Sequence, residues 1–161
     1  MILWLPDFRF VWSPRNHDVS RTGVDLRGRV RLPGRGLETW ADWSFNRATY
    51  DRPNSDDVQV AYRPRYQGGV GASVTRSAWS VLLDAHLTGA RFPVPNAVNE
   101  LPAFWTTNLR AQRTWGIGPV FLDVQMEIER LLDRRDTLIF AFPHPGRTFR
   151  ITLRLGPDTE S

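Results

Sequence analysis

Apolar residues recur at every second position through most of the chain, and this alternation restricts the fold more than any other feature. The run VFLDVQMEIE at residues 120–129 places Val, Leu, Val, Met and Ile on one side and Phe, Asp, Gln, Glu and Glu on the other. The same pattern occurs at residues 24–32, 79–88 and 149–155, and more loosely in WADWSFN, GGVGASVTR and WTTNLRAQR. A period of two is typical of β-strands. We therefore predict an all-β, antiparallel meander of about eight strands, the first of which (MILWLP) is incomplete.

The length of these runs separates two kinds of β-protein. The runs extend over about 9–12 residues, whereas strands of soluble proteins average about 5–6 and a tilted membrane-spanning strand needs about 9–11. Alternation alone does not say which side faces inward, because a soluble barrel buries its apolar side and a membrane barrel turns that side to lipid. Strand length therefore favours a transmembrane β-barrel.

Aromatic residues and loop lengths support the same prediction. Short connections (LPGRGLE, TRSAWS, WGIGPV) alternate with long ones near residues 51–66, 90–103 and 132–147, as in outer-membrane barrels, which have short periplasmic turns and long extracellular loops. Aromatic girdles form at the membrane interfaces of such barrels, although aromatics at strand ends also cap soluble cores. The residues near predicted strand ends are Trp40, Trp43, Trp79, Trp105, Trp115, Phe104 and Phe121.

Composition indicates one folded domain over residues 1–161 and excludes several classes. Hydrophobic residues make up 41% of the chain, which is too many for general disorder. The net charge is +4 and every basic residue is arginine, which reflects either codon bias or a surface that grips anions bidentately. No cysteine is present for disulfides or thiolate metal sites, no apolar run approaches about 18 residues, and the opening residues lack the basic region of a secretory signal.

Four motifs, in the right order along the chain, resemble the C-terminal barrel portion of TonB-dependent outer-membrane receptors of the vitamin B12 and siderophore type. They are WSPRN followed by GVDL, YRPRY at residues 62–66, IERLLD at 128–133, and FPHPGR at 142–147 before the alternating run TFRITLRL. In IERLLD, Arg130 stands where the family usually has Asn. The resemblance assigns the last corner to the family's closing motif, with Pro143, Pro145, Gly146 and Arg147.

The resemblance implies a gated pore without chemistry of its own, which takes up a scarce nutrient such as a siderophore-iron chelate or cobalamin. The implied location is the outer membrane, with lipid as a partner and with TonB acting through a plug domain. If the family orientation holds, the long loops are extracellular and their arginines attract an anionic metal chelate; alternatively they are merely solvated or pair with lipopolysaccharide phosphates. The candidate ligand contacts are Arg52, Arg63, Arg65, Arg91, Arg134 and Arg135.

The sequence also departs from this family. A plug domain and TonB box have no counterpart, and a family barrel has about 22 strands, so about fourteen are missing. The chain continues past Leu155 into GPDTES, whereas family members usually end on an aromatic residue. We expect an incomplete barrel segment of a longer receptor. The alternative is a small free-standing barrel or a structural or interaction protein without transport activity.

Catalytic and nucleic-acid functions have little support in the sequence. Common motifs for metal hydrolysis, nucleophilic serine and phosphate loops are missing, so we predict neither enzymatic activity nor a cofactor or metal site. Asp123, Glu127 and Glu129 share one side of a strand, where we expect them to pair with arginines of neighbouring strands: Arg110, Arg150 or Arg154. Asp84 beside His86 is interpreted as structural, because one histidine beside one carboxylate lacks the third group that a metal site or a catalytic triad needs. Arginines spread among acids argue against nucleic-acid binding, which needs a clustered basic stripe.

Overall fold

The structure is a computed structural model that describes residues 2–6, 12–16, 18–51, 58–94, 99–134, 137–139, 142–143 and 145–157. In these ranges every regular element is a strand, and no helix is long and apolar enough to cross a membrane. The strands are β1 (Ile2–Pro6), β2 (Trp12–Asn16), β3 (Val19–Leu32), β4 (Leu37–Tyr50), β5 (Tyr66–Arg76), β6 (Trp79–Thr88), β7 (Phe104–Ile117), β8 (Val120–Glu129), β9 (Thr137–Ile139), β10 (Phe142–Pro143) and β11 (Thr148–Pro157).

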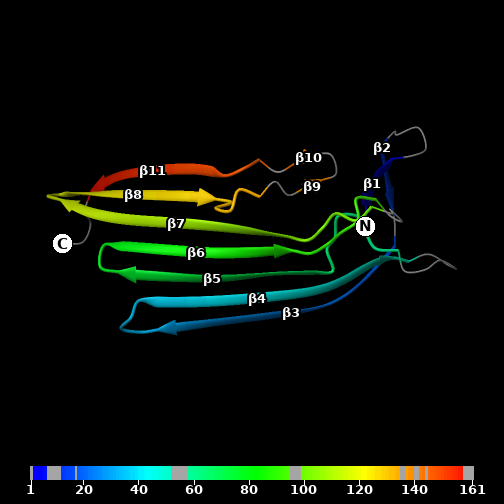
Figure 1. Cartoon of the computed structure of the whole chain (residues 1–161), viewed down its shortest axis with the longest axis horizontal. Coiled ribbons are helices and arrows are strands. Elements are labelled where there is room, and N and C mark those ends of the chain that lie inside the picture. Colours follow the sequence, from blue (N-terminus) through cyan, green and yellow to red (C-terminus); the bar gives the residue numbers. More distant parts are fainter. Residues whose placement is uncertain are drawn as a thin grey trace.

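Seven long strands form one antiparallel sheet in the order β11-β8-β7-β6-β5-β4-β3 (Figure 1). Each strand lies beside its neighbour in the sequence, except that the small β9–β10 hairpin intervenes before β11. The prediction of an all-β antiparallel meander is confirmed. The sheet is open: among the described residues, β3 and β11 each have a neighbour on one side only.

The predicted first strand does not extend this sheet. Residues of β1 pair with β2 in a separate two-stranded hairpin, in which Pro6 lies opposite Trp12 and Pro14 opposite Trp4. Proline has no backbone N–H and is therefore confined to edge positions of sheets. A two-stranded hairpin has only edge positions, so it accommodates a proline in each strand, and the main sheet has seven strands rather than the predicted number of about eight.

The connections divide the sheet into two ends. The turns at residues 33–36, 77–78 and 118–119 lie together at the turn end, at the left of Figure 1. The described parts of the segments 51–65, 89–103 and 130–147 lie at the opposite end, the loop end. The tightest turns are two residues long; in one of them Gly118 adopts a φ of 62°, a conformation that glycine enters without strain. The alternation of short and long connections therefore places all the long segments on one side.

The strand register sorts the side chains into two chemically different faces, because cross-strand partners share a face and faces alternate along a strand. The apolar face carries Val24, Leu26, Val30 and Leu32, Trp43 and Phe45, Val70 and Val74, Trp79, Val81, Leu83 and Leu87, Trp105, Leu109 and Trp115, Val120, Leu122, Val124, Met126 and Ile128, and Phe149, Ile151, Leu153 and Leu155. The polar face carries mainly Arg, Asp, Glu, Asn, Gln, Ser and Thr.

Not all of the strand-end aromatics lie where a girdle requires them. Trp43, Trp79, Trp105 and Trp115 belong to the apolar face, and Trp43 stacks on Tyr66 with ring centroids 5.9 Å apart. The remaining three, Trp40, Phe104 and Phe121, lie on the polar face. Their one-residue shift in strand phase is what moves them to the other side.

Among the described residues, no element packs against the apolar face. Leu26 is 62% exposed and Leu153 67% exposed, although both lie in regular strands. The chain exposes 11796 Å², whereas the surface relation for folded monomers gives about 8,200 Å² for this mass. In the described part of the chain, the buried apolar residues are instead at the loop end: Tyr50, Val60, Leu101 and Phe104.

A glycine on the polar face provides a local test of the packing. A Cβ built on Gly71 would lie 2.5 Å from Cε2 of the Trp40 indole, which covers this glycine from the adjacent strand. We expect Gly71→Ala to displace the indole and to destabilise the sheet by about 1–3 kcal/mol. Denaturant unfolding of the chain in detergent, followed by tryptophan fluorescence, measures both effects.

The matched control is Gly28→Ala, because a Cβ at Gly28 meets no atom within 4 Å. Both substitutions replace a strand glycine by the same residue, and only the first meets a ring. Equal stability of the two variants would contradict the packing of Trp40 against Gly71.

Candidate ligand-binding site

The long segments at the loop end are bonded to one another and to the strand ends. The segment after β4 turns back along it, with the Val60 amide donating to the Ala48 carbonyl at 3.0 Å. Tyr62 links this segment to the next one through a 2.8 Å bond from its amide to the Phe92 carbonyl. These backbone bonds fix the described part of the first segment against β4 and against the segment after β6.

Arg91 lies at the centre of this arrangement. It is 2% exposed, its Nη2 donates to the Thr137 carbonyl at 2.7 Å, and its guanidinium lies 5.2 Å from the ring centroid of Phe104. Desolvation lowers the pKa of Arg91, and the Tyr62 hydroxyl acts in the opposite direction. Arg91 was predicted as an exposed ligand contact; the structure makes it a buried group that joins separate loop segments.

A cavity of about 130 Å³ lies between the first long segment and the polar face. Arg63 and Pro64 line it from the loop, and Arg21, Asn46 and Gln67 line it from β3, β4 and β5. The Arg21 guanidinium is held by Asn46, whose Oδ1 accepts from Nε at 3.1 Å and from Nη2 at 2.8 Å. Arg21 and Arg63 thus line one small cavity, and guanidinium groups are chemically suited to pair with carboxylate or phosphate groups.

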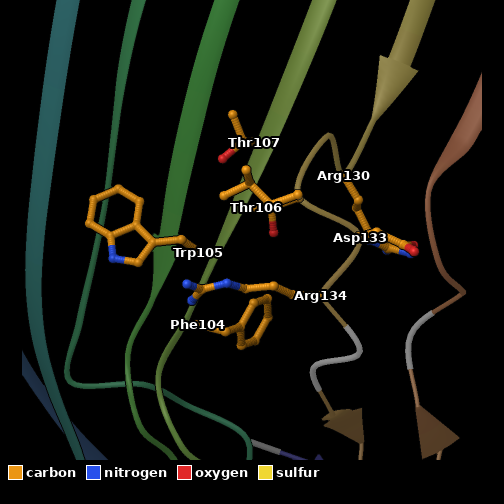
Figure 2. Close-up of a pocket in the computed structure, with 8 residues that line it drawn as sticks. Phe104, Trp105, Thr106, Thr107, Arg130, Asp133 and Arg134 are labelled. Atoms are coloured by element: carbon orange, nitrogen blue, oxygen red, sulfur yellow. The ribbon is translucent and has the colours of Figure 1, made fainter.

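The other predicted arginines are dispersed. Arg65 donates from Nε to Gln59 Oε1 at 3.0 Å. Arg134 extends back toward strand β7 beside Phe104 (Figure 2), in a pocket of about 10 Å³, which has room for about one water molecule. Arg52 and Arg135 lie outside the described residues. Of the four predicted arginines that the structure describes, Arg91 is buried, Arg65 is bonded to Gln59, Arg134 lines a pocket with room for about one water molecule, and Arg63 borders the cavity of about 130 Å³.

Arg21 was absent from the predicted contacts because it lies in a strand, among other polar-face arginines. The only sequence signal was its position near the start of β3, and a strand-phase assignment puts Arg21 on the same side as Asn46. The proximity of Arg21 to Arg63 depends on how the segment after β4 folds back over the polar face. The path of that segment cannot be read from local sequence patterns.

The corner that carries the family resemblance is fastened to the turn after β8. The Arg130 guanidinium donates to the Pro145 carbonyl, and Asp133 Oδ1 accepts from the Arg147 amide at 2.8 Å. A Cβ on Gly146 would lie 2.8 Å from the same Asp133 oxygen, so glycine allows the close approach. These contacts give the motif a structural role: it returns the chain beside β8, where β11 begins.

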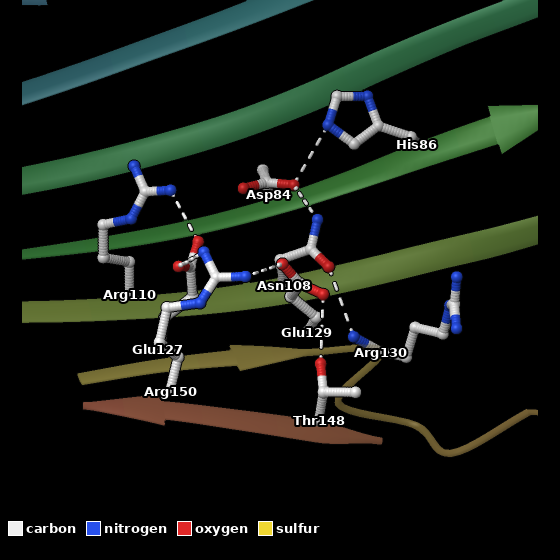
Figure 3. A network of polar contacts seen from close by, with 9 residues as sticks. All are labelled: Asp84, His86, Asn108, Arg110, Glu127, Glu129, Arg130, Thr148 and Arg150. Atoms are coloured by element: carbon white, nitrogen blue, oxygen red, sulfur yellow. Dashed lines mark hydrogen bonds and ion pairs between the residues drawn. The ribbon is translucent and has the colours of Figure 1, made fainter. Parts of the chain in front are cut away.

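Salt bridges cross three strands of the polar face (Figure 3). Glu127 on β8 accepts from Arg110 on β7 at 2.6 Å and from Arg150 on β11 at 3.4 Å. Glu129 lies 3.8 Å from Arg150 and accepts from the Thr148 hydroxyl at 3.0 Å. The predicted pairing of these two glutamates with Arg110 and Arg150 is confirmed. The network ties the closing strand to its neighbours.

Asp123 behaves differently from the two glutamates. It is buried and accepts from Gln112 at 3.0 Å and from Thr114 at 3.1 Å. Arg154 lies opposite Asp123 in register but forms no ion pair with it among the described contacts. Neutral donors therefore take the position that an arginine was expected to occupy.

Asp84 and His86 form a second polar group on β6. His86 Nε2 lies 3.1 Å from Asp84 Oδ2, which also accepts from Asn108 at 2.8 Å (Figure 3). Asn108 in turn accepts from the backbone amide of Arg130 at 3.2 Å. Over the described residues, no three His, Asp or Glu side chains are grouped as metal ligands would be.

Comparison of the sequence with models of protein families finds no match, and comparison with curated proteins finds none either. Support for a function of this chain therefore comes from the two faces of its sheet, its loop end and its sequence motifs.

Proposed function

We propose that this sheet is part of the wall of an outer-membrane, TonB-dependent receptor that takes up a scarce nutrient such as a siderophore-iron chelate or cobalamin. In this proposal the apolar face meets lipid, the polar face lines the lumen, and the loop end meets the nutrient outside the cell. The exposed apolar face carries the proposal, since no described element covers it.

The height of the apolar face fits a bilayer. Trp105 and Trp115 mark its two ends on β7, ten residues apart, which corresponds to about 33 Å along a strand. A strand tilted by about 40° spans about 25 Å of the membrane normal, the height of the apolar band in outer-membrane barrels. The charged residues of this face lie near its ends: Arg47 at the loop end, and Arg76 and Arg113 at the turn end.

The direction of the strands favours a wall that other strands complete. A meander of seven strands leaves β3 and β11 running in the same direction, so joining them would create a parallel pair. Bacterial outer-membrane barrels are antiparallel with an even number of strands. This geometry speaks against the alternative of a small barrel that closes on itself.

Uptake by whole cells tests the functional part of the proposal. Removal of the gene region that encodes this chain is expected to reduce uptake of one radiolabelled nutrient, with ferric chelates and cobalamin measured in parallel. Restoring the region should restore uptake. Unchanged uptake of every nutrient would contradict a transport role while leaving membrane residence to a separate measurement.

The cavity beside Arg63 predicts a preference for anionic ligands. A volume of about 130 Å³ is below the range of about 300–1,000 Å³ typical of whole-ligand sites, so we expect it to hold one acidic group of a larger chelate. Arg63→Gln should weaken binding of ferric citrate by about 10- to 100-fold, because a charge-assisted hydrogen bond contributes about 1.5–3 kcal/mol. Titration calorimetry on the chain in detergent measures the change.

The control is Arg76→Gln at the turn end, where an arginine is lost far from the cavity. Equal weakening by both variants would show that only net charge matters. Binding of ferric citrate that is insensitive to Arg63→Gln would remove the cavity from the proposal.

A further inference from the structure

The free edge of β3 is long and regular. All fourteen residues, Val19–Leu32, pair with β4 without a register shift, and no strand lies on the outer side of β3 among the described residues. Proteins protect exposed edges with short strands, proline, bulges or charged side chains, because unpaired backbone groups recruit other strands. The sequence of β3 contains no proline and its pairing shows no bulge, so its arginines are the feature that restricts which strand its outer edge can accept.

Charge is distributed unevenly over the polar face. The two outermost strands hold six of its seven arginines: Arg21, Arg27, Arg29, Arg31, Arg150 and Arg154. The inner strands hold six of its seven acids: Glu38, Asp42, Asp84, Asp123, Glu127 and Glu129. On β3 itself, four arginines against one aspartate (Asp25) leave a net charge of +3.

The neighbouring strand neutralises only part of this charge. Glu38 on β4 forms salt bridges with both Arg29, at 3.4 Å, and Arg31, at 2.7 Å. Arg21 is bonded to the neutral side chain of Asn46. Arg27 has no ion-pair partner among the described residues. The polar side of β3 therefore retains cationic groups that inner strands leave unneutralised.

We propose that the outer edge of β3 docks an acidic, amphipathic β-strand that runs antiparallel to it. The strand adds to the ladder by backbone hydrogen bonds, places carboxylates opposite the β3 arginines, and continues the apolar face with its other side. The inference concerns the sheet edge and does not depend on a transport function.

Two other occupants fit less well. A second copy paired through its own β3 would set two arginine rows against each other, and like charges directly opposite destabilise a sheet. The β11 edge of another copy also carries arginines, Arg150 and Arg154, and would lie antiparallel to β3 only with the loop and turn ends reversed. Charge therefore selects a partner whose chemistry differs from both edges of this chain.

Disulfide trapping tests the pairing directly, because the chain contains no cysteine of its own. The probes are two synthetic peptides of about 11 residues, in which valine and leucine alternate with either glutamate and threonine or lysine and threonine. Each peptide carries one cysteine, and the chain carries Val30→Cys on β3. In detergent micelles we expect the acidic peptide to form at least about tenfold more adduct than the basic peptide. Raising NaCl from about 0.05 to 0.5 M should reduce the preference.

Charge-reversal variants of the chain provide a second test of the preference for the acidic peptide. Arg21→Glu combined with Arg27→Glu, added to Val30→Cys, should make the basic peptide the preferred partner, whereas Arg154→Glu on β11 should leave the acidic preference unchanged. Circular dichroism verifies that each variant keeps its sheet. Equal trapping of the two peptides, trapping of neither by a folded chain, or a disulfide dimer of two chains as the main product would each overturn the proposal.

Discussion

Leu83→Arg is expected to stop the chain from inserting into a bilayer. Leu83 lies in the middle of the apolar face, opposite Ala72 on β5 and Leu109 on β7. A guanidinium at this depth is far from both ends of the face, and an arginine near the bilayer midplane costs about 2–4 kcal/mol in an outer-membrane barrel. Reconstitution into lipid vesicles, followed by flotation on a density gradient, measures the inserted fraction.

Leu82→Arg is the matched control. The two leucines are adjacent in β6, and Leu82 lies on the polar face. The same chemical change is therefore placed on opposite sides of one strand. We expect Leu82→Arg to insert nearly as well as the unchanged chain. Insertion of the Leu83 variant at the level of the Leu82 variant would refute the lipid-facing assignment, and so would a freely soluble, monomeric chain without detergent.

Arg91→Ala is expected to loosen the loop end while the sheet remains folded. The substitution removes a charged hydrogen bond to Thr137 and a cation–π contact with Phe104. Such a hydrogen bond contributes about 1.5–3 kcal/mol and a cation–π contact about 0.5–2 kcal/mol. We expect the local opening free energy to fall by about 2–4 kcal/mol. Hydrogen exchange at the Leu101 amide, which donates to the Arg91 carbonyl at 2.8 Å, should accelerate by about 30-fold or more.

Arg63→Ala is the control for this effect, because it removes an exposed arginine from a neighbouring loop segment. Exchange at the Leu101 amide should change little in that variant. An unchanged exchange rate in Arg91→Ala would mean that the backbone bonds between the segments suffice, and that the guanidinium does not hold the loop end together.

Strand identity and facing were predictable because they depend on local periodicity. The alternation over residues 120–129 and 149–155 assigns each side chain to a face without knowledge of its neighbours, and the register of β8 with β11 confirms it. The salt bridges of Glu127 followed from this phase together with the order of the strands. The separate β1–β2 hairpin was not anticipated, because the choice of a pairing partner for a strand is not encoded in its own periodicity.

The candidate site was less predictable, because loops combine residues distant in sequence. Arg91 and Arg63 both lie in long connections, yet one is buried against Phe104 and the other borders a cavity. The difference depends on how the segments after β4 and β6 return over the strand ends. Backbone bonds such as Tyr62 to Phe92 determine that return, and no periodic pattern encodes them.

Local sequence was enough to predict an all-β meander, two faces of opposite polarity and long connections on one side, since strand period and turn residues act over a few residues. The three-dimensional arrangement was needed to show that β3 and β11 run in the same direction, each with one neighbour among the described residues, and that Arg91 is buried. These features depend on the number and pairing of whole strands and on contacts between distant loops. The unneutralised arginines of β3 could be identified only from the pairing of β3 with β4 and from the ion pairs between them.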